Sequence, residues 1–153
     1  MTMIEKLLSL ADDLLARGTR SAVAKRRAVS TAYYAVFHAV ARLCADELLG
    51  VSSRSTEDYL RVYRALDHGP LKSVFASVAI KENPRLREIG DRIVRLQSER
   101  HRSDYLPPGT LYSRGECAQL LEVARSAVQL LSELPSEARR TLAVSVLFKN
   151  RPS

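Results

Sequence analysis

The sequence of 153 residues has no tryptophan, two cysteines, three histidines, and six residues each of glycine and proline. Two cysteines are too few for the disulfide framework of a small secreted domain. Apolar runs fall far short of the roughly twenty residues that span a bilayer, and the first residues lack a basic segment followed by an apolar one. We therefore expect a soluble, cytoplasmic protein without membrane contact.

Neither cysteine has a second cysteine or a histidine at the spacing of metal ligands, and no phosphate-binding loop or nucleophile motif is visible. We therefore expect no metal and no cofactor. Cys44 and Cys117 both fall within apolar helical patterns, which favours buried, reduced thiols. A disulfide between the two is the less favoured alternative.

The length is typical of one domain, and a hydrophobic content of 46% is enough to bury a core. Apolar residues recur at helical spacing, and no strand-like alternation of useful length interrupts them. The pattern predicts helices over about 4–17, 20–49, 56–66, 71–80, 85–105, 113–134 and 136–148. We therefore expect an all-α fold. It would be an up-and-down four-helix bundle with one or two additional short helices, in a single domain over 1–153 with its core at about 4–134.

Local signals set the expected helix ends. Gly18 and Gly50 are placed to end the first two helices, and Asn83 followed by Pro84 is typical of a cap and a first-turn proline. His68, next to a glycine and a proline, is interpreted as a turn residue that closes the third helix.

The second predicted helix carries the most informative pattern. Its apolar positions recur at steps of three and four residues, and alanines between them allow close helix packing. These positions are Val29, Tyr33, Val36, Val40, Leu43 and Cys44. We expect Tyr33 and Tyr34 to serve the core and a subunit contact rather than base stacking. His38 is better interpreted as a hydrogen-bonded interface residue than as a catalytic one.

The formal net charge is +7, and arginine far outnumbers lysine. The planar guanidinium matches phosphate and carboxylate groups, so a polyanionic partner such as RNA is one interpretation. Basic residues are spread along almost every segment, and a solvated basic surface is the other interpretation. Charge alone leaves both open.

One charged residue interrupts an apolar stripe. The predicted helix at 85–105 places Leu86, Ile89, Ile93 and Leu96 on one face, and the next step of the same phase falls on Arg100. Asp104 lies four residues further on, within reach of Arg100 on that face. The two side chains could form a purely structural ion pair that pins the helix end.

The same helix end also offers a site for phosphate recognition with groups for proton transfer. The candidate catalytic residues are Arg100, His101, Asp104 and Tyr105, with Arg100 as the cation and His101 as the group for proton transfer. The candidate residues for binding a nucleic acid or nucleotide are Arg95, Arg100 and Arg102.

Two segments together resemble a known family. Residues 27–39 contain Ala32-Tyr33-Tyr34-Ala35 on an early helix, and residues 100–105 carry an Arg-x-x-x-Asp-Tyr motif on a later one. This combination resembles the small stand-alone branch of the HEPN domain family, over roughly residues 14–134. The resemblance implies a helical homodimer that is often encoded beside a small nucleotidyltransferase and acts in toxin–antitoxin or related defence systems.

Many HEPN members are metal-independent ribonucleases, in which an arginine and a histidine with four to six residues between them form the active site across the dimer. Here the positions that follow Arg100 at that spacing hold Tyr105, Leu106 and Pro107. Arg95 and His101 have the spacing formally. The sequence therefore predicts an RNA- or nucleotide-binding protein with ribonuclease activity as one outcome. The alternative is a catalytically silent dimer that serves as a protein-binding or scaffold module.

Overall fold

The computed structural model describes residues 1–17, 21–109 and 111–148. Within these ranges the chain forms eight α-helices, one short 3-10 turn and no β-strand, which confirms the all-α class. The α-helices are α1 (Met3–Arg17), α2 (Ala22–Leu49), α3 (Glu57–Arg64), α4 (His68–Phe75), α5 (Val78–Lys81), α6 (Pro84–Tyr105), α7 (Arg114–Ser132) and α8 (Ser136–Leu147).

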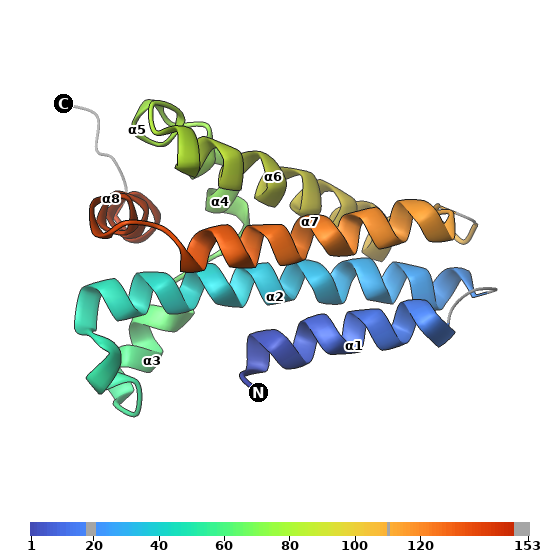
Figure 1. Cartoon of the computed structure of the whole chain (residues 1–153), viewed down its shortest axis with the longest axis horizontal. Helices are drawn as coiled ribbons and strands as arrows, with labels where there is room; N and C mark the ends of the chain where they lie inside the picture. The colour runs from blue at the N-terminus through green and yellow to red at the C-terminus, as the bar shows by residue number, and fades with distance from the viewer. Residues whose placement is uncertain (18–20, 110, 149–153) are drawn as a thin grey trace.

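Helix α2 is the centre of the molecule. It packs against α1, α6 and α7, and these four long helices run in alternating directions along the chain (Figure 1). The predicted α2 stripe is buried throughout, since Val29, Tyr33, Val36 and Val40 have no exposed area. Thirteen residues of α2 are buried in all, so burial extends around much of the helix.

The shorter helices gather at the end where α2 finishes (Figure 1). Helices α3 and α8 pack against α2, while α4 and α5 pack against α6 and α8. At the opposite end, where α2 begins and α6 ends, the described residues include no short helix. The two ends of α2 therefore have different surroundings.

Side-chain caps mark the beginning of four helices, including the predicted cap at Asn83. The side-chain oxygens of Ser21, Thr56, Asn83 and Ser113 each accept a hydrogen bond from an amide in the first turn of α2, α3, α6 and α7. Helix α2 ends at Gly50, which has a φ of +85°, where glycine is unstrained. The predicted ends at Gly18 and Arg20 lie outside the described residues.

The prediction of one short helix over 71–80 is wrong, and so is the interpretation of His68 as a turn residue. Helix α4 begins at His68 and ends at Phe75, and a separate helix α5 follows after Ser77, whose backbone is extended. Pro70 lies in the first turn of α4, where a missing amide costs nothing because that amide has no partner within the helix.

Both cysteines are buried and free, so the disulfide alternative is wrong. Burial raises the pKa of the Cys44 thiol to about 12 and also raises that of Cys117. Both groups are therefore neutral thiols in the core.

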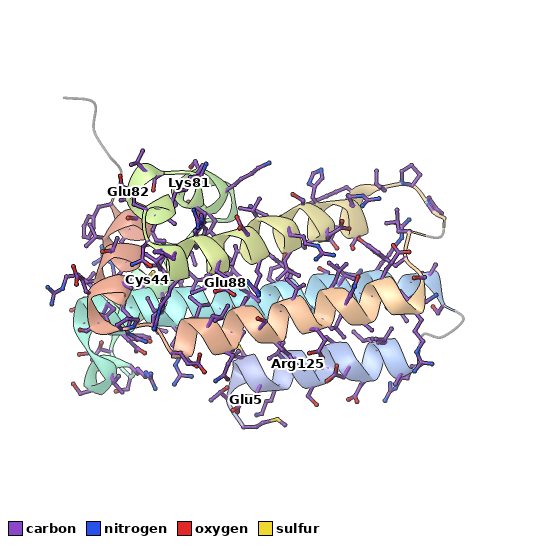
Figure 2. All side chains as sticks on the ribbon, turned by 45° about the horizontal axis from the view of Figure 1, so that its top comes forward. Glu5, Cys44, Lys81, Glu82, Glu88 and Arg125 are labelled. Carbon is purple, nitrogen blue, oxygen red and sulfur yellow. The ribbon has the colours of Figure 1, made fainter. Side chains whose placement is uncertain are left out.

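A surface ion pair links the first and seventh helices. Arg125 of α7 pairs with Asp12 of α1 and with Glu122 one turn earlier on α7. Figure 2 places Arg125 where these two helices run side by side. Because all three side chains are substantially exposed, the network adds little to the free energy of folding.

Candidate functional site

Arg100 lies at the end of the buried stripe of α6, as predicted. Leu86, Ile89, Ile93 and Leu96 are fully buried or nearly so, and the Arg100 side chain is only 14% exposed. Its guanidinium carbon lies 5.4 Å from the ring centre of Tyr33 on α2. This contact of a cation with an aromatic face holds the end of α6 against α2.

The partner of Arg100 is Asp104, as the four-residue spacing predicted. Nη1 of Arg100 lies 3.6 Å from Oδ2 of Asp104, and the hydroxyl of Ser30 on α2 donates to the same oxygen at 3.4 Å. Both distances are long for charge-assisted contacts. Nε of Arg100 is buried and has no hydrogen-bond acceptor among the described residues. The pair therefore leaves donor capacity unused.

Hydrogen bonds from Arg26 link the start of α2 to the chain just after the end of α6. Its guanidinium donates to the carbonyls of Leu106 at 2.8 Å, Pro107 at 2.7 Å and Gly109 at 3.2 Å. These acceptors lie just after the end of the helix, where carbonyls lack helical partners and favour a cation. The sequence analysis assigned Arg26 no such role, because its acceptors lie 80 residues or more further along the chain.

A hollow of about 210 Å³ lies beside the hydrogen bonds of Arg26. It is lined by Val23, Arg26, Arg27, Ser103 and Asp104. It is smaller than the roughly 300–1,000 Å³ of typical small-molecule pockets. A single phosphate or carboxylate group suits this space better than a whole nucleotide. We call Arg26, Arg27, Ser30, Arg100 and Asp104 the α2–α6 corner.

The four predicted catalytic residues divide between two faces of α6. Arg100 and Asp104 face α2, whereas His101 and Tyr105 lie on the exposed side, with 67% of Tyr105 exposed. The rings of His101 and Tyr105 are 4.8 Å apart, centre to centre, and inclined at 44°. The structure thus places an exposed aromatic pair next to the corner rather than one compact quartet.

The remaining predicted binding residues, Arg95 and Arg102, are exposed on α6. Nη1 of Arg102 lies 3.0 Å from Oε1 of Glu99, which offsets part of its charge. Glu99 also accepts a hydrogen bond of 2.8 Å from the hydroxyl of Tyr112. Arg102 therefore belongs to a local network and carries less free charge than the sequence suggested.

Two other predicted residues have roles inside the fold. Burial raises the pKa of Tyr33 to about 12, so its hydroxyl stays protonated near neutral pH. His38 shares a hydrogen bond of 2.5 Å with the hydroxyl of Tyr63 on α3, and the two rings stack. The expectation of a hydrogen-bonded His38 is confirmed, with its partner in the same chain.

No group of three or more histidine, cysteine, aspartate or glutamate side chains in the described part of the chain could hold a metal ion. None of the described helices combines the length and the apolar character needed to cross a membrane. No protein-family model, curated protein or solved structure matches the chain.

Proposed function

We propose that the chain is a HEPN-like RNA- or nucleotide-binding protein whose phosphate site is the α2–α6 corner. The observation that carries the proposal is the position of Arg100. A guanidinium occupies an apolar stripe, its Nε lacks a described acceptor, and its pairing with Asp104 is long. Burying a charge in this way is costly, which is reasonable if the charge serves a ligand.

The surroundings of the corner suit a single-stranded nucleic acid. Arg27 is exposed at the hollow, and Arg95 and Arg102 are exposed along α6. His101 and Tyr105 offer exposed rings on which a base could stack. Phosphate contacts would supply most of the affinity, and stacking would favour unpaired bases over a duplex.

Ribonuclease activity is the enzymatic form of this proposal. A base would take the proton of a ribose 2′-hydroxyl, the resulting oxygen would attack phosphorus, and the departing 5′-oxygen would accept a proton. This leaves a 2′,3′-cyclic phosphate and requires no metal. His101 is the proposed proton-transfer group and Arg100 the group that stabilises the developing charge. In a homodimer, a second copy would contribute a second His101.

The resemblance of residues 27–39 and 100–105 to HEPN proteins supports the remaining parts of the proposal. We propose a cytoplasmic homodimer that works beside a small nucleotidyltransferase in a toxin–antitoxin or defence system. Sedimentation of the purified protein tests the dimer directly, and a sedimenting monomer at micromolar concentration would contradict it.

A silent scaffold is the second candidate function. The observation that favours it is that Arg100 already has two partners, the carboxylate of Asp104 and the ring of Tyr33. In this alternative, the corner only fixes α6 on α2, and the protein surface recruits another protein.

The test measures the fluorescence anisotropy of a labelled, mixed-sequence single-stranded RNA in the presence of EDTA. We expect Arg100→Met to weaken binding about tenfold or more, the effect of losing one charged hydrogen-bonding group. Arg85→Met, at the exposed start of the same helix, is the matched control and should bind as the wild type does. Wild-type protein that binds no RNA would favour the scaffold.

Cleavage is measured on the same RNA by gel electrophoresis. If the enzymatic form is correct, both Arg100→Met and His101→Ala abolish cleavage, while His101→Ala retains RNA binding. Wild-type protein that binds RNA without cleaving it would reduce the proposal to a binding function.

A further inference from the structure

A second candidate site lies at the other end of α2. Two adjoining hollows, of about 410 and 460 Å³, share Thr2, Ile4, Arg42 and Arg54 in their walls. Each has the size of a small-molecule pocket. They lie beside the start of α1, and Figure 2 places Glu5 there. Arg42 is twelve residues beyond Ser30 on α2, or about 18 Å along the helix, so this site is separate from the α2–α6 corner.

Arg54 forms a bidentate pair with Asp46 at this site. Its Nε and Nη2 donate to the two oxygens of Asp46 at 2.9 and 2.6 Å, and the hydroxyl of Tyr59 donates to Asp46 at 2.8 Å. The Asp46 side chain is only 8% exposed. Arg54, Asp46 and Tyr59 therefore form a rigid wall between the end of α2 and α3.

Arg42 differs from Arg54 because its guanidinium has no close hydrogen bond to a carboxylate among the described residues. Its closest ion-pair contact among the described residues joins Nε to Oδ2 of Asp46 at 3.9 Å, too long for a hydrogen bond. The side chain is 35% exposed and borders both hollows. A guanidinium in this position can offer its fork to an incoming anion.

The charged side chains around the hollow of about 410 Å³ indicate the charge of the ligand. Arg54 is paired with Asp46, and Arg139 is paired with Glu47 at 2.7 Å, so Arg42 is the lining cation that lacks a close carboxylate partner. Glu5 stays ionised because its hydrogen bond from the Thr2 amide lowers its pKa. One available guanidinium beside the carboxylates of Glu5 and Asp46 suits a monoanion better than a doubly charged phosphate group, which these carboxylates would repel more strongly.

Most of the remaining lining residues are apolar. Ile4, Leu43, Val128 and Leu131 border the first hollow, and the second adds Met3, Leu60 and the ring of Tyr63. We propose that the two hollows bind an amphipathic monocarboxylate, with its carboxylate on Arg42 and its aliphatic or aromatic body against these walls. Two contributions would favour binding: the charge-assisted hydrogen bonds between the carboxylate and the Arg42 guanidinium, and the burial of the apolar part of the ligand.

Isothermal titration with octanoate tests this site. We expect one molecule to bind per chain, with Arg42→Met at least tenfold weaker and with an unchanged melting temperature. Arg61→Met, on the exposed side of α3, is the matched control and should bind as tightly as the wild type. Acetate has the head group alone and should bind far more weakly than octanoate.

A second variant tests the site while leaving Arg42 in place, so that its result does not depend on how Arg42→Met folds. Leu60 is 43% exposed, so Leu60→Asp should leave the fold intact while its negative charge repels the ligand. The proposal is overturned if the folded wild type gives no heat with octanoate, if Arg42→Met binds as tightly as the wild type, or if inorganic phosphate binds as tightly as octanoate. Arg100→Met should bind octanoate normally, which separates this site from the proposed RNA site.

Discussion

Two arginine–carboxylate pairs contact opposite ends of helix α2, and they differ in how completely the hydrogen-bonding capacity of the carboxylate is satisfied. At its end, Asp46 receives three hydrogen bonds of 2.6 to 2.9 Å from Arg54 and Tyr59. Near its beginning, Asp104 of α6 lies 3.4 Å from the Ser30 hydroxyl and 3.6 Å from Arg100. The Asp46 side chain is 8% exposed and that of Asp104 is 22% exposed.

The difference distinguishes a structural pair, Arg54 with Asp46, from the pair of Arg100 with Asp104, in which Arg100 has an unused hydrogen-bond donor. A carboxylate whose oxygens are both engaged and shielded from solvent has little capacity for a ligand, and its loss leaves partners unpaired. A long, partly open pair beside a hollow can exchange partners at small cost. This contrast supports the assignment of ligand binding to Arg100 rather than to Arg54.

We expect Asp46→Ala to cause the largest loss in the free energy of unfolding. It removes the common partner of Arg54 and Tyr59, and we expect it to lower the free energy of unfolding by about 2–3 kcal/mol, less than for a fully buried pair because Arg54 is 38% exposed. Asp104→Ala should cost less than about 1 kcal/mol. Urea unfolding of the two variants measures both values. Equal losses would remove the contrast between the pairs.

The pH dependence of Asp46 should follow from the same contacts. Burial alone would raise its pKa, but the hydrogen bonds from Arg54 and Tyr59 outweigh burial and hold the pKa below the ordinary value of 3.8. Its stabilisation is therefore present above 3.8 and is lost as the pH falls below that value. The difference in unfolding free energy between wild type and Asp46→Asn should shrink in that range. A difference that stays constant down to pH 3 would contradict the lowered pKa.

We expect a smaller loss of stability when the hydroxyl group that contacts each carboxylate is removed. Tyr59→Phe removes a hydrogen bond of 2.8 Å to Asp46 and should cost about 1–2 kcal/mol. Ser30→Ala removes the 3.4 Å contact to Asp104 and should cost less than about 0.5 kcal/mol, because alanine also favours the helix. Thermal melting of the two variants compares them, and a larger loss for Ser30→Ala would reverse the assignment.

The smallest expected effect concerns His38, next to the Asp46 end of α2. Burial lowers its pKa below 6.5, so protonation favours the unfolded chain. As the pH falls through 6.5, the wild type should lose some stability that His38→Gln retains. Melting temperatures of both proteins between pH 8 and pH 5 measure this. Parallel curves would show that His38 is not the group responsible.

The helices could be predicted from the sequence because their signals are local. Three- and four-residue spacing predicted α2 and α6, and Asn83 and Ser113 marked where helices begin. The error at His68 arose because glycine and proline indicate both a turn and a tolerated first helical turn. Sequence signals alone did not separate these two outcomes.

The candidate site was predictable only within one helix. Arg100 and Asp104 share a face at a spacing of four residues, and their pairing is confirmed. The hydrogen bonds from Arg26 to the end of α6 depend on tertiary packing across 80 residues. The aromatic pair of His101 and Tyr105 also has a spacing of four residues, so helical geometry could have placed it apart from Arg100.

The most direct test of the account is the affinity of Arg100→Lys for single-stranded RNA. Lysine keeps the positive charge beside Asp104 but lacks the planar fork and the buried Nε. If Arg100 recognises phosphate, the variant should melt within a few degrees of the wild type and bind RNA at least several-fold more weakly. Unchanged RNA affinity in a folded Arg100→Lys protein would contradict the account and leave Arg100 with a structural role.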